Sequence, residues 1–460
     1  MQKYMFKVMI IPATILLYAC SVGPDYKAPQ VVLTGKYKEI PQGWKVAEPR
    51  DNLDKGSWWE IFNDAQLNIL ISKVNVNNQN IASAVAQYKH ALALVDETAA
   101  NYWPVVTFEP SINRARSLTA KSPTTTYLIE PSASWSPDLF GVVRRAVEAS
   151  QAGAQASAAQ LADTKLSMQA LLAQNYFQLR AADITQQLLD ETVDDYQKAL
   201  QLTKNRYAAG VASRLDIAQA ETQLQSAQTQ ALDNGITRAQ YEHAVAVLLG
   251  EAPENFSLDK KAFDLPIPRI PMQVPSELLE RRPDIAQAER LVAQANANIG
   301  LAIAAYFPAL TLTGTDGFSS TRFKKLTLHS ARIWSAAATI TETIFDGGLR
   351  RAQTSAARAA YDEAVANYKQ TVLAALQQVE DNLVALRILE AEVEVQNAAI
   401  KSADLSLKIT TNKYKSGTSA YSDVITAQTT AYATKKTAVD IYSRRLIAAV
   451  SLIQALGGGY

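Results

Sequence analysis

Apolar side chains recur at steps of three and four over two very long stretches of the sequence. The first stretch runs from about Arg144 to Tyr207, and such spacing is typical of one face of an α-helix. In the second stretch the apolar positions follow a heptad rhythm, at Val372, Leu376, Val379, Leu383 and Leu386. Roughly 64 helical residues extend on the order of 100 Å. The pattern therefore predicts either a coiled-coil stalk or the wall of a helical tube.

Similar turn sequences follow the two long stretches, so that the same motif occurs twice in the chain. The first copy spans 205–216 (NRYAAGVASRLD) and the second spans 412–423 (NKYKSGTSAYSD). Tyrosine, glycine and aspartate hold the same positions in both, as Tyr207, Gly210 and Asp216 and as Tyr414, Gly417 and Asp423. Glycine readily ends a helix in the left-handed conformation, and Ser213 or Ser419 can cap the helix that follows. One copy fits an ordinary turn between helices, but two copies in register indicate a repeat architecture with two helical-hairpin tips.

A shorter helical pattern precedes each long one. The first, from about Ala65 to Ala100, stops before Pro104, and the second, from Glu277 to Ala305, stops before Pro308. Proline ends a helix and releases the chain into extended structure. The repeat thus covers nearly the whole chain after its N-terminal part.

Beyond each proline, apolar and polar side chains alternate with period two. The apolar set comprises Val106, Phe108, Ile112, Tyr127, Ile129, Ala133 and Trp135 in the first half and Leu310, Leu312, Trp334, Ala336, Ala338 and Ile340 in the second. Each half therefore supplies one hairpin, at about 105–137 and about 309–343, with strands long enough to cross a bilayer when tilted. Alternation alone also fits soluble hairpins with one wet face.

Four strands cannot close a barrel by themselves. An open edge in lipid leaves backbone groups unpaired at a cost of several kcal/mol each, so other copies of the chain must complete the sheet. Two copies give eight strands and a barrel filled by its own side chains, whereas three copies give twelve strands and a polar lumen. We expect a trimer if the protein conducts anything.

The N-terminus has the layout of a secretory signal. Lys3 and Lys7 precede an apolar stretch that ends at Ala19, and this stretch is too short to span a bilayer. The residues Leu17-Tyr18-Ala19-Cys20 resemble the lipobox of bacterial lipoproteins, in which the cysteine is lipidated. Tyr18 departs from that pattern, and the alternative is a cleaved signal with an incidental cysteine. Cys20 is the only cysteine, so no internal disulfide forms.

Composition argues against an enzyme, a nucleic-acid partner and a cofactor. The formal net charge is +1, from 45 Lys+Arg against 44 Asp+Glu, so no polyanion partner is indicated. The three histidines, His90, His243 and His329, lack ligand spacing, and no phosphate-binding loop is present. Transport energy must therefore come from a partner. Adjacent tryptophans, Trp58 and Trp59, fit packing of the N-terminal segment better than ligand stacking.

Several motifs together resemble the outer membrane factor family, the TolC-like and OprM-like exit ducts of bacterial efflux and secretion systems. The most specific match is 278–289 (LLERRPDIAQAE), continuing to 306–310 (YFPAL). Further matches are 20–26 (CSVGPDY), Trp58-Trp59 and 345–348 (FDGG). The resemblance is closest to the lipid-anchored branch that serves resistance-nodulation-division pumps, and with Ser21 after the cysteine it implies sorting to the outer membrane.

The resemblance implies a mainly α fold with a β-barrel. A homotrimer would form a twelve-stranded outer-membrane barrel continuous with a twelve-helix periplasmic α-barrel and a mixed equatorial region. Its expected partners are outer-membrane lipid, a periplasmic membrane-fusion adaptor and an inner-membrane pump. The expected organisation is a signal peptide (1–19), a lipid-anchored extended segment (20–64), a first repeat (65–250), an equatorial linker (251–275), a second repeat (276–457) and a short tail (458–460).

The same resemblance implies roles for the repeated turn. Its glycines and first cap, Gly210, Gly417 and Ser213, would lie at the periplasmic tip where the adaptor docks. A family hydrogen bond that holds the tip closed falls on Asp216 and Tyr414. A basic partner found in some members is replaced here by Ser419. Asp423 fits one of two constriction aspartates while Thr426 holds the other position, which predicts a single carboxylate ring. Without the family, Asp423 reads equally well as a solvated residue at a helix start.

One structural rival remains on the sequence alone, a lipid-anchored trimeric coiled-coil stalk or adaptor that does not conduct. Two hairpins of bilayer-crossing length argue against it, because a stalk has no use for them. No feature names the cargo, and only Met168 and Met272 lie beyond the predicted signal, which argues against a methionine-lined copper or silver route.

Overall fold

The computed structural model describes residues 22–29, 56–116, 122–261, 263, 266–268 and 281–458. They divide into two compact units. Unit 1 comprises Met1–Val31, Gln87–Ala158 and Gln287–Gln370, and unit 2 comprises Val32–Ala86, Ala159–Ala286 and Thr371–Tyr460. The predicted signal peptide and Cys20 lie outside the described residues.

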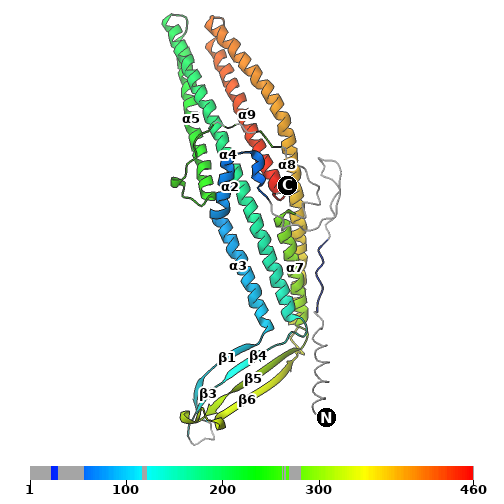
Figure 1. Ribbon diagram of the computed structural model, residues 1–460. Coiled ribbons are helices and arrows are strands. Elements are labelled where there is room, and N and C mark those ends of the chain that lie inside the picture. The colour runs from blue at the N-terminus through cyan, green and yellow to red at the C-terminus, as the bar shows by residue number, and fades with distance from the viewer. Residues whose placement is uncertain are drawn as a thin grey trace. The chain divides into compact units, whose positions relative to one another are not determined.

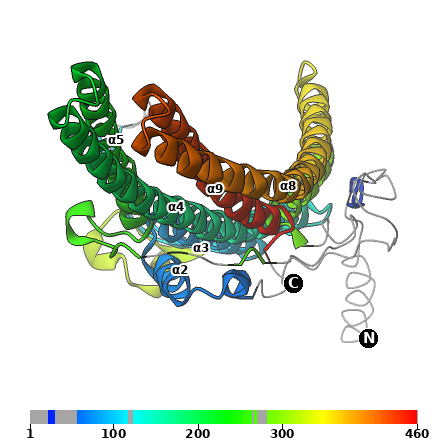
Figure 2. The same ribbon diagram turned by 90° about the horizontal axis from the view of Figure 1, so that it is seen from above.

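Each half of the chain contains a 67-residue helix followed by a 35-residue helix. These are α4 (Val142–Ala208) and α5 (Arg214–Leu248) in the first half, and α8 (Leu349–Lys415) and α9 (Tyr421–Ala455) in the second. Within unit 2, α5 lies alongside α4 and α9 lies alongside α8 (Figure 1 and Figure 2). The long helices and their turns are where the sequence predicts them. None of the described helices combines the length and hydropathy that crossing a membrane requires.

The single helix predicted from Ala65 to Ala100 is wrong in one respect, because it is broken at Asn78. It forms α2 (Ala65–Asn77) and α3 (Gln79–Ala99). Asn78 Nδ2 donates to the carbonyl of Leu248 at 2.8 Å, while Asn78 Oδ1 accepts from the N–H groups of Asn80 and Ile81 at 3.0 and 3.1 Å. This buried side chain therefore caps α3 and ties it to the end of α5.

Both predicted proline boundaries are confirmed. After Pro104 the chain enters β1 (Val105–Phe108), and after α7 (Pro283–Ala304) and Pro308 it enters β5 (Ala309–Ser320). Short 3-10 turns lie at Trp58–Phe62, Ala100–Tyr102, Pro253–Asn255, Phe323–Lys325 and His329–Ala331.

Unit 1 contains an antiparallel sheet built from both halves. Its other strands are β2 (Ser111–Ala115), β3 (Thr124–Ile129), β4 (Pro131–Trp135) and β6 (Arg332–Thr341). The order is β1-β4-β5-β3-β2, and β6 pairs with the other edge of β5. The register sets Ser134 opposite Thr313 and Ala309 opposite Thr341. Every residue of β6 is exposed in the single chain, including Trp334 at 74% and Ile340 at 72%.

The main core lies in unit 2 and includes Trp58, Trp59 and Phe62 from the segment that precedes α2. Trp58 and Trp59 are 2% and 9% exposed, and the Trp58 indole N–H donates to Gln169 Oε1 at 3.1 Å. Tyr176 donates its hydroxyl proton to Asp64 Oδ2 at 2.6 Å, and Asp64 in turn caps α2. The tryptophan pair packs the segment onto α4, as predicted.

A buried arginine organises the junction beside the C-terminus of α9 in unit 2. Arg282 is 7% exposed and grips Asp284 with two hydrogen bonds of 3.0 and 2.7 Å. Its third nitrogen donates to the carbonyl of Ala455 at 2.8 Å. Burial first, and then the charge of Asp284, raise the pKa of nearby Asp163 to about 6.

In unit 1, a second buried arginine holds the segment that follows Cys20. Arg145 Nε donates to the carbonyl of Val22 at 3.1 Å and its Nη2 donates to the carbonyl of Gly23 at 3.3 Å. Asn296 Nδ2 donates to the carbonyl of Pro24 at 3.0 Å. A Cβ added to Gly23, whose φ is +99°, would lie 2.5 Å from the Cα of Gly300, so only glycine permits this close approach.

Candidate functional site

The two tips end in the same backbone motif. Gly210 and Gly417 adopt φ values of +75° and +78°. Each glycine N–H donates to the carbonyl of the repeated tyrosine, 2.9 Å from Tyr207 in the first tip and 3.0 Å from Tyr414 in the second. The following N–H bonds back to the residue before that tyrosine, at 2.9 Å in both tips. This is a Schellman-type helix end, and it confirms the prediction that a left-handed glycine ends the helix at each tip.

The helices that leave the tips begin differently. Ser213 caps α5 in a reciprocal capping box, since its Oγ accepts from the Asp216 N–H at 3.1 Å and Asp216 Oδ2 accepts from the Ser213 N–H at 3.0 Å. The prediction that Ser419 caps α9 is wrong. Ala420 occupies the cap position and has no side chain that can do so. Ser419 lies one residue earlier and donates its hydroxyl proton to Asp423 Oδ2 at 2.6 Å.

Tyr414 lies at the centre of a small cluster in unit 2 that joins the two tips. It is 4% exposed, and its ring centroid is 5.3 Å from that of Tyr421. The guanidinium carbon of Arg206 lies 4.7 Å from the ring centroid of Tyr414, and the Tyr414 hydroxyl donates to Thr203 Oγ1 at 3.4 Å. Residues of α4, α5, α8 and α9 contribute to this cluster, namely Leu200, Ala220, Tyr414, Tyr421 and Val424.

Asp216 and Tyr414, the predicted hydrogen-bonded pair, have other partners within the chain. The Asp216 carboxylate accepts from Ser213, and the Tyr414 hydroxyl faces Thr203. Burial is the main cause that raises the pKa of Tyr421 to about 12, and the negative charge of Asp216 adds to it. The Asp216–Tyr414 bond stays a prediction for the assembled protein.

Asp423 and Thr426 lie together near the start of α9. Both line a cavity of about 240 Å³ with residues of α8. Thr426 donates its hydroxyl proton to the carbonyl of Ser422 at 3.0 Å, as a threonine within a helix commonly does. Only one of the two predicted constriction positions therefore carries a carboxylate.

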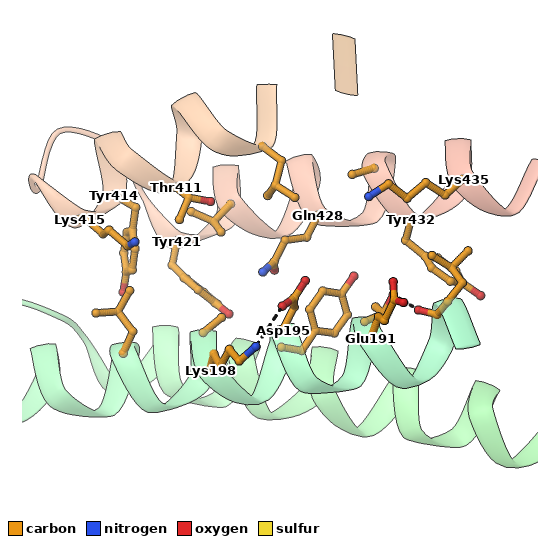
Figure 3. A pocket seen from close by; sticks show the side chains of 18 residues that line it. Glu191, Asp195, Lys198, Thr411, Tyr414, Lys415, Tyr421, Gln428, Tyr432 and Lys435 are labelled. Carbon is orange, nitrogen blue, oxygen red and sulfur yellow. Dashed lines mark hydrogen bonds and ion pairs between the residues drawn. The ribbon is translucent and has the colours of Figure 1, made fainter. Parts of the chain in front are cut away.

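A larger cavity of about 510 Å³ lies between α4 and the hairpin of α8 and α9 (Figure 3). Four tyrosines line it: Tyr196, Tyr414, Tyr421 and Tyr432. Lys198, which also lines it, pairs with Asp194 at 2.5 Å and with Asp195 at 3.7 Å. Gln428 is 9% exposed, and its Oε1 is buried without a hydrogen-bond partner. Aromatic walls, both signs of charge and an open acceptor suit the side chains of a protein partner.

Sequence reasoning missed Arg206, Thr203 and Tyr421. One signal was available for Arg206, because a basic residue precedes the repeated tyrosine in both tips, Arg206 in the first and Lys413 in the second. Within the described part of the chain, no group of three or more His, Cys, Asp or Glu side chains is arranged to hold a metal ion.

Comparison with known proteins extends over nearly the whole chain. The family model described as "Outer membrane efflux protein" matches residues 70–251 and 274–458. The cation efflux system protein CusC of Escherichia coli O6:H1 is 28% identical over 458 residues, which cover 99% of each chain. The outer membrane protein OprJ of Pseudomonas aeruginosa is 29% identical over 472 residues, covering 100% of this chain and 97% of OprJ. The solved structure of the outer-membrane channel OprN superimposes with a TM-score of 0.87 at 29% identity, covering 96% of this chain and 99% of that one.

Proposed function

The chain belongs to the outer membrane efflux protein family, and from that premise we propose that it is the gated exit duct of a tripartite efflux pump. It is an outer-membrane protein and not an enzyme. The duct would receive small molecules from a periplasmic adaptor and an inner-membrane pump of the resistance-nodulation-division type and pass them passively to the exterior. Cys20 would carry the lipid that anchors it.

The observation that carries the proposal is the combination of an incomplete sheet with paired helical hairpins. In the described residues, β6 pairs only with β5, and β1 and β2 each have one partner strand, so the sheet ends in open edges. In lipid such edges must be paired, and copies of the same chain offer matching edges. β2 follows β1 after two residues and β4 follows β3 after one, so each pair counts as one interrupted strand and the chain supplies four. Three copies would then supply twelve strands and a polar lumen. A non-conducting stalk, the second candidate, leaves this sheet without a use.

We place the gate at the repeated tips. Three symmetric Asp216–Tyr414 bonds would hold the tips closed, since a hydrogen bond to a charged acceptor contributes roughly 1.5–3 kcal/mol. A docked adaptor would displace them, and the tyrosine-lined cavity beside the second tip is a suitable surface for its side chains. With Ser419 in place of a basic residue, no ion pair between subunits is expected there, and Asp423 alone would form the carboxylate ring.

The cargo is not assigned. CusC is named for cation efflux, but only two methionines lie outside the predicted signal of this chain, which argues against a methionine-lined copper or silver route. Selectivity is expected to reside in the inner-membrane pump.

Antibiotic susceptibility of cells that carry Tyr414→Phe tests the gate. Loss of the hydroxyl should open the closed tip and raise the passive entry of bulky antibiotics. Tyr207→Phe is the matched control, because it is the same change at the equivalent, half-exposed position of the first tip. Unchanged susceptibility in Tyr414→Phe, at equal trimer levels, would count against the latch.

A further inference from the structure

Arg206 makes two contacts with the opposite tip of its own chain. It stands in the last turn of α4, in the first tip, and its Nη1 donates to the carbonyl of Lys415 at 2.8 Å. Lys415 is the last residue of α8. The last carbonyls of a helix lack partners within the helix and carry its negative dipole end. This carbonyl is therefore a favourable acceptor for a cation.

The second contact is with the face of an aromatic ring. The Arg206 guanidinium lies over the Tyr414 ring at 4.7 Å, within the range of a cation–π interaction. The guanidinium also lies next to Gly417, since a Cβ built there would be 3.7 Å from Arg206 Nη2, an ordinary van der Waals distance. Arg206 thus contacts the ring, the helix end and the turn of the second tip together.

Nothing else in the described structure accounts for the placement of this side chain. No carboxylate among the described residues forms an ion pair with Arg206, and its Nε is buried without a hydrogen-bond partner. An unpaired buried N–H costs free energy, whereas an arginine near a helix end could reach water. The stacked position must therefore be stabilised by the two contacts with the second tip.

We propose that Arg206 is the clamp that holds the α4–α5 tip to the α8–α9 tip within each chain. The tips cannot move apart without breaking both contacts, so the clamp sets how readily one hairpin separates from the other. Its effect on conduction rests on the gate proposed above, but the clamp itself is a property of one chain. It does not depend on Asp216, whose carboxylate accepts from the Ser213 N–H within the chain.

The direct test is the distance between the tips. Spin labels on introduced cysteines at the exposed positions Val211 and Thr418 report this distance by pulsed electron paramagnetic resonance, in trimers assembled with an excess of unlabelled chains. Arg206→Lys keeps the charge but loses the planar fork that stacks and donates at once. Arg214→Lys, an exposed arginine at the start of α5, is the matched control.

We expect a narrow distance distribution in the wild type and in Arg214→Lys, and a broadened, longer one in Arg206→Lys. Tyr414→Leu, which removes the ring, should broaden it as well, while Tyr414→Phe keeps the ring face and should stay narrow. An unchanged distribution in Arg206→Lys trimers overturns the clamp.

Conductance separates the clamp from the gate. If both proposals hold, Arg206→Lys raises the single-channel open fraction about fivefold, as expected for losing a planar group that stacks on a ring and donates a hydrogen bond at once. Broadened distances without a change in current keep the clamp and refute the gate at the tips. Increased current in Tyr414→Phe with unchanged distances in Arg206→Lys keeps the gate and refutes the clamp.

Discussion

Removing the Arg145 guanidinium should release the segment 22–29 from α4, on which its first residues are held. Arg145→Met keeps most of the aliphatic stem that packs on Gly300 but deletes the donors to the carbonyls of Val22 and Gly23. The bond to Asp25 adds little, because that carboxylate is 91% exposed. Two hydrogen bonds from a charged donor stabilise the docked segment by about 3 kcal/mol at the lower end of their usual range. Their loss should raise the released population roughly 100-fold.

Limited trypsin digestion measures this population. Cleavage after Lys27 requires its neighbours to leave the surface, so the rate follows the open fraction when reclosing is fast. The fragment that begins at Ala28 can be followed by mass spectrometry. Arg144→Met is the matched control, since Arg144 is the exposed neighbour on the same turn. Gly23→Ala should act like Arg145→Met, because its Cβ would collide with backbone. Equal cleavage rates in wild type, Arg145→Met and Arg144→Met would refute the reasoning.

Three further predictions concern the tips and the junction beside α9. Ser213→Ala should destabilise the first turn of α5 by about 1 kcal/mol and speed hydrogen exchange of its amides. Ser419→Ala should leave the exchange rates of the α9 amides unchanged. Equal effects of the two substitutions would contradict the assigned caps. Asp423→Asn should weaken the block of channel current by divalent cations added from the periplasmic side. An unaltered block would contradict the prediction that Asp423 forms the single carboxylate ring. Burial raises the pKa of Asp163 in the folded protein from 3.8 to about 6. Ionisation of this carboxyl therefore lowers the free energy of unfolding as pH rises through that window. The free energy of unfolding of Asp163→Asn, relative to wild type, should increase by about 1–2 kcal/mol between about pH 4 and pH 8. Thermal unfolding at both pH values checks this, and a constant difference contradicts it.

Most elements of the fold could be predicted because their signals are local. The long helices follow from apolar spacing, and both tips follow from a glycine at a repeated position. Trp58 and Trp59 were correctly predicted to pack. The break at Asn78 could not be predicted, since its cause is the carbonyl of Leu248, which is distant in sequence.

Contacts between the first and the second repeat could not be predicted from the sequence either. Alternation predicted a hairpin in each half but carries no information on the pairing of β4 with β5. Arg206 was missed for the same reason, because its partners, Tyr414 and the carbonyl of Lys415, belong to the other repeat. Ser419 was misassigned because its register in the repeat is one residue earlier than that of Ser213.

Conductance of the detergent-purified trimer in planar bilayers tests the central claim most directly. Wild type should give small, cation-preferring currents, and Tyr414→Phe should give larger ones, which would establish a gated duct with its gate at the repeated turn. The absence of current from both proteins, in a preparation shown to be trimeric, would contradict the account and favour a non-conducting stalk.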